Sequence, residues 1–211
     1  TTEIYTLSLH DALPISATVS KRQASRLPAL LDAAASHFAD KGYHATTIRD
    51  IAQVAGVTPG AVYFHVPTKQ ALLIAVYTEG VDRMLGHLEQ AVAGEADSQL
   101  RFRRSIKAHL EAILDDSAYA RVIVRVLPDD VPEAKAELKV QRERYEARFR
   151  ALIGELDLES GRDPKLMRLL LIGALNWTPV WYRRLGGSLD HIVDAFMAAF
   201  GERRDEKAGR R

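Results

Sequence analysis

The fold is decided by residues 46–66, TTIRDIAQVAGVTPGAVYFHV. Thr47 and Asp50 have the spacing of a capping box, in which each side chain bonds the other residue's backbone N–H, so a helix begins here. Gly56 supplies the positive φ that a tight turn needs. Pro59 is tolerated in the first turn of a helix, which places the start of a second helix beside it. The stretch therefore predicts two short helices joined by a tight turn.

This arrangement is that of a DNA-binding helix-turn-helix, whose second helix enters the major groove. Its exposed residues are small or carry hydroxyl, ring or imidazole groups. Small residues let the backbone approach the bases, and Thr and Tyr donate to phosphates. Lys69 opens the next helix, where an ammonium and a helix N-terminus both suit a phosphate. The predicted DNA-contacting residues are Thr46, Thr47, Thr58, Pro59, Gly60, Ala61, Tyr63, Phe64, His65 and Lys69.

Outward from this motif, apolar residues recur at helical spacing, and no segment shows the alternation of a strand. Upstream, Leu27 to Phe38 form such an apolar face, and Gly42 is placed to end that helix. Further helices are expected over residues 72–88, 102–113, 118–127, 138–156, 166–182 and 192–200. We therefore expect an all-α fold, with an N-terminal three-helix helix-turn-helix domain and a C-terminal helical bundle.

The composition is that of a folded chain, with 47% hydrophobic and 27% charged residues among 211. The chain has no cysteine, which excludes disulfides and thiolate metal sites. No apolar run approaches the roughly 20 residues that span a bilayer. The net charge is +1, but residues 21–69 hold six basic and three acidic side chains. A basic N-terminal unit ahead of a slightly acidic body suits attraction to phosphate.

Residues 1–16, TTEIYTLSLHDALPIS, show no sustained period, and Pro14 interrupts them. They resemble a peptide that appears when sequencing-adaptor DNA is translated. We expect a disordered or artefactual leader over residues 1–20, with a natural flexible arm as the alternative.

Residues 30–69 resemble the N-terminal domain of the tetracycline-repressor (TetR) family. The resemblance is carried by an alanine pair before an aromatic, a Gly-aromatic step, a Thr-rich helix start, a Gly-Val turn, a recognition-helix Tyr and a following Lys. These are Ala33, Ala34, Phe38, Gly42, Tyr43, Thr46, Thr47, Gly56, Val57, Tyr63 and Lys69. Val66 departs from the family, which usually has Phe there, and we expect only a small packing change.

The resemblance implies a homodimeric repressor that a small-molecule effector releases from a palindromic operator. It implies phosphate contacts at Thr47 and Lys69. It implies groove contacts at Thr58, Gly60, Tyr63 and His65. We accordingly divide the chain into the leader (1–20), a helix-turn-helix domain (21–68), a ligand-binding and dimerisation domain (69–203) and a basic tail (204–211).

Two C-terminal stretches, GALNWTPVWY at 173–182 and SLDHIVDAF at 188–196, resemble the last two helices of regulators that respond to fatty acids or acyl-coenzyme A thioesters. Pro179 departs from that pattern and should bend its helix. The resemblance implies an acyl-CoA or another hydrophobic effector. The candidate ligand-binding residues are Arg121, Arg125, Tyr145, Phe149, Asn176, Trp177 and Trp181. Two alternatives stay open, since the tryptophans could fill a core or an interface and the arginines could form a solvated face.

A helix-turn-helix monomer reads too few base pairs to be specific, so we expect a two-fold partner. The last two helices offer apolar and close-packing surface beyond what one small core needs. The predicted interface residues are Leu169, Gly173, Ile192, Phe196 and Ala199.

An enzyme is disfavoured, because the sequence has no Gly-rich phosphate loop, no His-x-x-x-His pair and no cysteine nucleophile. The remaining alternative is a helical protein-interaction adaptor without sequence-specific DNA binding. We expect a cytoplasmic DNA-binding regulator that is not an enzyme. Its expected partners are double-stranded operator DNA, a second copy of itself and an effector, with no metal, cofactor or membrane.

Overall fold

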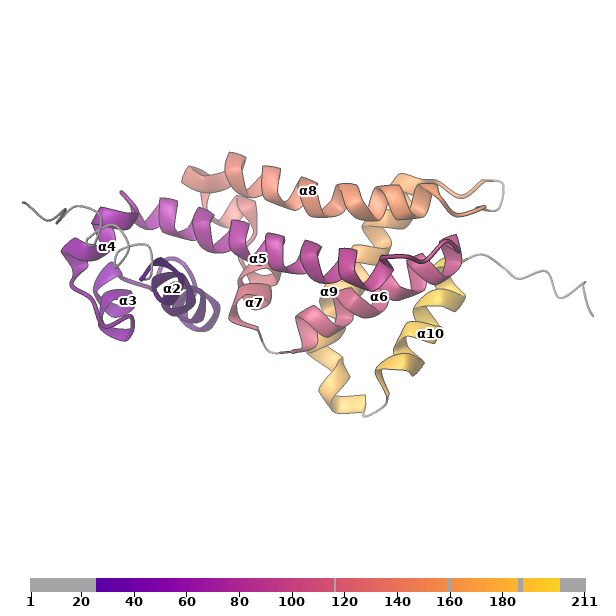
Figure 1. Ribbon diagram of the computed structural model, residues 1–211, viewed down its shortest axis with the longest axis horizontal. Coiled ribbons are helices and arrows are strands. Elements are labelled where there is room, and N and C mark those ends of the chain that lie inside the picture. The colour runs from indigo at the N-terminus through magenta and orange to yellow at the C-terminus, as the bar shows by residue number, and fades with distance from the viewer. Residues whose placement is uncertain (1–25, 116, 159–160, 186–187, 202–211) are drawn as a thin grey trace, which may run out of the picture.

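A computed structural model describes residues 26–115, 117–158, 161–185 and 188–201, and Figure 1 shows these residues as an elongated set of helices. The all-α fold predicted from the sequence is confirmed for these residues. The predicted leader (1–20) and basic tail (204–211) lie outside the described residues. No helix within the described ranges has both the length and the apolar character needed to cross a membrane.

The N-terminal end is built from α2 (Leu27–Lys41), α3 (Ile48–Val54) and α4 (Pro59–His65). Gly42 ends α2 at a φ of 81°, where its N–H reaches the Phe38 carbonyl. The capping box between Thr47 and Asp50 is present at the start of α3. Gly56 takes a φ of 64° in the turn, and the Thr58 side chain caps α4. These local signals produce the helix-turn-helix that the sequence predicts.

The long helix α5 (Lys69–Val92) runs along the long axis of the molecule and links its two ends (Figure 1). Thr68 caps it by accepting from the Ala71 N–H. The helix contacts α2, α6 (Ser98–Leu114), α7 (Ala118–Arg125) and α8 (Lys135–Gly154). Leu73 and Tyr77 are fully buried at this junction. The hydrophobic core is consequently one continuous cluster from the helix-turn-helix to the C-terminal bundle.

The helix expected over residues 118–127 ends earlier, at Arg125. A residue that precedes proline is pushed out of the helical region, and Leu127 before Pro128 is extended, with φ −82° and ψ 149°. Two 3-10 turns follow, Pro128–Asp130 and Pro132–Ala134. They carry the chain from α7 back towards α5 and into α8.

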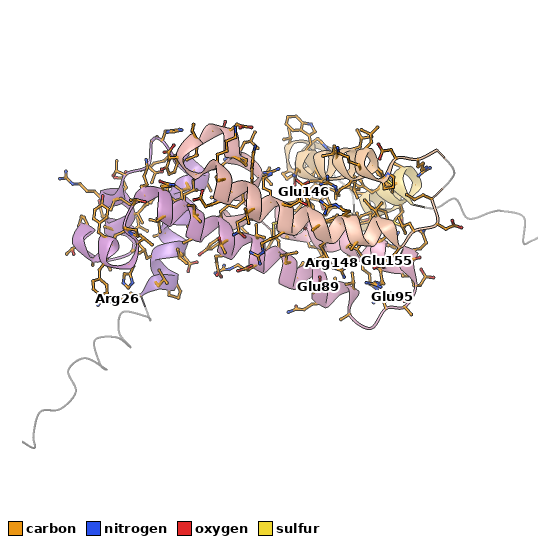
Figure 2. The ribbon with its side chains drawn as sticks, turned by 90° about the horizontal axis from the view of Figure 1, so that it is seen from above. Arg26, Glu89, Glu95, Glu146, Arg148 and Glu155 are labelled. Atoms are coloured by element: carbon orange, nitrogen blue, oxygen red, sulfur yellow. The ribbon has the colours of Figure 1, made fainter. Side chains whose placement is uncertain are left out.

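The far end of the molecule holds α9 (Pro164–Leu185) and α10 (Leu189–Phe200), which contact each other (Figure 1). Pro179 lies inside α9, within the helix that the sequence predicts over residues 166–182. In the view of Figure 2, Arg148 of α8 lies next to Glu89 of α5, and Arg148 Nε donates to the Glu89 carboxylate over 2.5 Å. Val66, the departure from the family pattern, is buried in the core as predicted.

Candidate DNA-contacting surface and effector cavities

The second helix of the motif, α4, divides its residues between core and solvent. Val62 is fully buried against the rest of the domain. Tyr63 and Phe64 are 53% and 68% exposed, although both are large aromatic residues. Thr58, Pro59 and Gly60 are also exposed, at the start of the helix. Five of the residues that the sequence assigned to the DNA groove are therefore exposed at α4, whereas Ala61 and His65 are half-buried.

Thr47 is exposed at the start of α3, and its hydroxyl oxygen accepts from the Asp50 N–H over 3.2 Å. The hydroxyl proton is not used in that bond, so it is free to be donated to a phosphate. The Asp50 carboxylate accepts in turn from the Thr47 N–H. The hydrogen bonds to Thr47 lower the pKa of Asp50 below its ordinary value, so this capping box stays charged at neutral pH.

Thr46 does not lie on this surface. Its side chain is 1% exposed, and its hydroxyl lies 2.8 Å from the Gly42 carbonyl and 3.1 Å from the His37 carbonyl. The hydroxyl holds the end of α2 against the loop that leads to α3. The DNA contact predicted for Thr46 is therefore replaced by a structural role, because its hydroxyl is hydrogen-bonded to carbonyls within the domain.

Lys69 is also turned inward. Its Nζ donates to the carbonyls of Tyr43 at 2.9 Å and of Thr46 at 3.0 Å, with the His44 carbonyl at 3.5 Å. The ammonium also lies 4.4 Å from the centre of the Tyr43 ring, an attractive cation–π contact. All three ammonium protons therefore have acceptors within the chain. The structure therefore does not support the phosphate contact predicted for Lys69. The side chain instead connects α5 to the loop between α2 and α3.

Replacing Lys69 with Met is expected to lower the free energy of unfolding by about 1–3 kcal/mol, because three carbonyls lose a charged donor. The slope of log K for DNA against log salt should stay unchanged, whereas loss of a phosphate contact would lower it by about 0.9 per lysine. Urea melts and DNA titrations at several salt concentrations measure the two quantities. A changed salt slope with an unchanged free energy of unfolding would indicate that Lys69 contacts DNA.

In the C-terminal bundle, a small cavity of about 30 Å³ is lined in part by a buried histidine that the sequence analysis did not single out. His109 of α6 is 2% exposed, and its Nδ1 lies 2.8 Å from the hydroxyl of Tyr145 on α8. The cavity is lined by Val81, Met84, His109, Ile123, Arg142, Tyr145, Glu146, Ile172 and Asn176. We call it the His109 cavity.

The charged groups at the wall of this cavity have hydrogen-bond partners within the chain. Arg142 donates to the Tyr77 hydroxyl at 3.2 Å and to the Ile123 carbonyl at 3.3 Å. Glu146, labelled in Figure 2, forms an ion pair with Arg168 of α9, whose side chain is only 9% exposed. A buried ion pair is costly to break, because the remaining partner is left charged without compensation. The charges therefore hold α8 and α9 together.

Burial lowers the pKa of His109 from its ordinary value of 6.5 to about 4. The unfolded chain then binds more protons than the folded chain between these pH values. The stability that this group contributes is complete above pH 6.5 and is lost as the pH falls towards 4, by about 3 kcal/mol in all. We expect urea melts at pH 7 and pH 4.5 to differ less for His109→Phe than for the unaltered protein. Equal pH dependence of the two proteins would contradict a buried, neutral His109.

Two further hollows lie beside α7. One, of about 170 Å³, is lined by Ile113, Leu114, Ala120, Arg121, Val124, Arg125 and Pro179, and we call it the Arg125 cavity. The other is an open pocket of about 480 Å³, lined by Gly80, Arg83, Met84, His87, Glu111, Ala112, Asp115, Ser117, Tyr119 and Ala120. Met84 lines both the open pocket and the His109 cavity, so the two hollows meet at this residue.

The structure brings together only some of the candidate ligand-binding residues. Tyr145 and Asn176 line the His109 cavity, and the Phe149 ring packs edge-on against His109 at 5.8 Å. Arg121 and Arg125 line the separate Arg125 cavity.

The two tryptophans are placed differently from these residues. Trp177 is 63% exposed and lines none of these hollows, which corrects the expectation that it faces a ligand. Trp181 is half-buried, and it lines none of the three hollows described. A residue that the sequence analysis missed is His109. It falls on the apolar face of α6, and this spacing could have indicated that it is buried.

An apolar surface runs along α9. Its members are 48–63% exposed large apolar residues at helical spacing, around the exposed Gly173. They are Leu166, Leu169, Leu170, Trp177 and Val180, and together with Gly173 they form what we call the α9 stripe. A Cβ atom at Gly173 would meet no atom within 4 Å, so another helix has room to approach closely here.

The predicted interface residues therefore differ in position. Leu169 and Gly173 lie on the α9 stripe, and Ala199 is exposed on α10. Ile192 is half-buried. Phe196 is only 8% exposed and stacks on Phe200 at 6.2 Å, so its ring packs within its own chain. The interface predicted at Phe196 is corrected on this ground.

Known proteins share both parts of this architecture. Residues 30–76 match the bacterial regulatory proteins of the tetR family, and residues 95–202 match the tetracyclin repressor-like C-terminal domain. The HTH-type transcriptional activator FasR of Mycolicibacterium smegmatis is 31% identical over 72% of this chain and 71% of its own.

Two solved structures show the same fold. FadR from Bacillus subtilis, in complex with stearoyl-CoA, is 21% identical with a TM-score of 0.72, over 83% of this chain and 98% of its own. AibR, in complex with isovaleryl coenzyme A and operator DNA, is 21% identical with a TM-score of 0.71 over the same shares. Because the family matches cover both the helix-turn-helix and the C-terminal bundle, this chain belongs to the TetR family and is a DNA-binding transcriptional regulator.

Proposed function

We propose that the protein is a homodimeric repressor in the cytoplasm that leaves a palindromic operator when an acyl-CoA binds its C-terminal bundle. It has no catalytic step and needs no cofactor in this proposal. The DNA contacts are made by Thr47, which holds a phosphate, and by α4, which enters the major groove. The groove residues proposed are Thr58, Pro59, Gly60, Ala61, Tyr63, Phe64 and His65.

Dimerisation is assigned to the α9 stripe. Exposed apolar side chains in a continuous row are unfavourable in water and mark a surface that another protein covers. A second copy of this chain is the natural partner, because a palindromic site is read by two recognition helices related by a two-fold axis. Packing of two α9 helices around Gly173, flanked by α10 with Ala199, would form a four-helix interface.

The observation that carries the effector-dependent part is the position of α7 between the cavities and α2. Arg121 and Arg125 line the Arg125 cavity, and they also bond to Asp40 at 2.8 Å and to the Ala39 carbonyl at 3.0 Å. Tyr119 lines the open pocket and donates to Asp32 of α2 over 2.8 Å. A ligand that displaces α7 therefore changes contacts with the helix that carries the DNA-binding motif.

A second contact joins the same two parts of the molecule. The Tyr43 hydroxyl donates to Glu133 over 3.2 Å, and His44 Nε2 lies 2.9 Å from the Asp130 carbonyl. Both partners lie in the two 3-10 turns that follow α7. An effector releases DNA only through its difference in affinity for the two arrangements of these helices. The acyl-CoA class is proposed from the C-terminal sequence pattern and from the ligands of FadR and AibR.

The test begins with selection of bound duplexes from a random DNA pool, using the full chain. We expect a palindromic consensus with half-sites about one helical turn apart. Stearoyl-CoA and isovaleryl-CoA are then titrated into the protein–operator complex, and release by either supports the effector class. Binding to all duplexes alike would favour the adaptor alternative, and a palindrome that neither thioester releases would leave the DNA function intact and reject the effector class.

A further inference from the structure

The ring of His109 is buried, and its two nitrogens have different surroundings. Nδ1 is engaged with the Tyr145 hydroxyl at 2.8 Å. Nε2 is shielded from solvent and has no partner within hydrogen-bond distance among the described residues, although the Asn176 side chain lies near enough to the ring to offset part of the effect of burial on the pKa of His109. Buried polar atoms without a partner are rare in folded proteins, and each one calls for a physical explanation. This atom belongs to a residue that lines a cavity.

Hydrogen bonding at Tyr145 determines which nitrogen carries the proton. Burial raises the pKa of Tyr145 well above its usual range, so the phenol keeps its proton at neutral pH. Within the described parts of the chain, His109 Nδ1 is the hydrogen-bond partner of this hydroxyl. A phenol that donates to Nδ1 satisfies its own proton and leaves the imidazole proton on Nε2, whereas a bond from Nδ1–H would leave the phenol proton without an acceptor, so the Nε2–H tautomer is the favoured one. His109 Nε2–H is consequently a buried donor in need of an acceptor.

The rest of the wall leaves room for such an acceptor. The His109 cavity, about 30 Å³, can hold roughly one water-sized group. Of the charged groups beside it, Glu146 is paired with Arg168, and Arg142 donates from Nη1 to the Tyr77 hydroxyl and the Ile123 carbonyl. The other walls are the apolar side chains of Val81, Met84, Ile123 and Ile172, together with the Asn176 amide. A single oxygen attached to an apolar body suits this combination.

We propose that His109 Nε2–H anchors a hydrogen-bond acceptor oxygen of the effector, and that in an acyl-CoA this oxygen is the thioester carbonyl. The inference rests on the proposed effector function and adds the chemical group that is recognised. The ligand reaches the anchor from the open pocket by moving Met84, which lines both spaces. Tyr145 is a positioning residue, because it acts by holding the tautomer of His109. A free fatty acid offers a similar oxygen in its carboxylate.

The binding test uses two ligands that differ only at this oxygen. Stearoyl-CoA carries the carbonyl, and S-octadecyl-CoA, a thioether, has a methylene in its place. We expect the full-length protein to bind the thioester roughly tenfold more tightly, since a buried donor is satisfied by only one of the two. His109→Phe should bind both alike. Stearic acid, titrated in parallel, distinguishes a free carboxylate from the thioester as the favoured source of the oxygen.

The matched control is Ser105→Ala, which removes a buried hydroxyl one turn away on the same helix. Ser105 donates to the Phe102 carbonyl and does not line the His109 cavity, so the ligand preference should survive. Tyr145→Phe keeps the ring and removes the hydroxyl, and it should weaken the preference even if His109→Phe fails to fold. A preference that both His109→Phe and Tyr145→Phe retain would overturn the proposal.

A second measurement does not depend on any ligand. Nitrogen-15 spectra of the histidine rings of the free protein, assigned by comparison with His109→Phe, report which ring nitrogen carries the proton. We expect the proton to lie on Nε2 in the unaltered protein. In Tyr145→Phe we expect the proton either to leave Nε2 or to exchange between the two ring nitrogens. A free protein with the proton on Nδ1 would overturn the anchor. If neither thioester nor acid binds the protein, the effector class proposed above fails, and the spectra still decide whether Nε2 is a donor.

Discussion

Leu170→Glu is expected to convert the protein into monomers and to weaken operator binding by at least about 100-fold, because linking two recognition helices contributes an effective-concentration gain of that order. Leu170 is 57% exposed and lies within the α9 stripe. In a two-fold interface, each substitution places two carboxylates in an apolar contact without partners, which is strongly unfavourable. Sedimentation velocity measures the dimer, and titration of the selected operator at one salt concentration measures the affinity.

The control for this variant is Val140→Glu. Val140 is 58% exposed, like Leu170, but it lies on α8 outside the stripe, so the dimer and the operator affinity should be unaffected. Phe196→Glu is a poor test of the interface, because Phe196 is 8% exposed and a charge there would disrupt the core of one chain. A Leu170→Glu protein that stays dimeric and binds the operator normally would assign the interface to another face.

The parts of the fold that the sequence predicted are those set by neighbouring residues. The capping box of Thr47 and Asp50, the positive φ of Gly56 and the cap by Thr58 all act within four residues of the chain. Such interactions depend on local spacing alone, so a single sequence reveals them. Helix α7 ended before its expected boundary for a local reason as well, namely Pro128.

The side chains that sequence reasoning misplaced are those whose surroundings come from distant parts of the chain. Thr46 belongs to a Thr-rich helix start that looks like a phosphate site, but carbonyls of α2 and the loop after it take its hydroxyl. Lys69 opens a helix, yet its acceptors lie more than twenty positions earlier. The spacing of neighbouring residues carries no information about these contacts.

Helix α9 shows a second reason why the sequence alone did not place every side chain. It is apolar on two faces, so periodicity could not tell which face is inside. Asn176 and Trp177 are adjacent in sequence, but the first lines the His109 cavity and the second is 63% exposed on the stripe. Successive helical residues point about 100° apart, so neighbours easily serve different surfaces. The direction of the inner face follows only from the packing of α9 against α6 and α8.

Tyr63→Ala is expected to lower operator affinity by about 2–6 kcal/mol, because a groove contact contributes about 1–3 kcal/mol and a dimer has two. Tyr63 is 53% exposed on α4, directly beside the buried Val62 that holds the helix in place. Truncation of an exposed side chain should leave the melting temperature and the dimer unchanged. Operator titration at constant salt, together with sedimentation and thermal melting, measures these three properties.

Tyr63→Phe separates the two ways in which this side chain can contribute. If the hydroxyl donates to a phosphate, Tyr63→Phe should lose a large part of the affinity and lose it equally for operator and unrelated duplexes. If the ring contacts base edges, Tyr63→Phe should retain affinity, and only Tyr63→Ala should reduce the preference for operator. Val140→Ala provides a matched truncation of an exposed apolar residue away from the DNA. Normal operator affinity in a well-folded Tyr63→Ala dimer would remove α4 from the groove, because its exposed aromatic residue would then make no contact there.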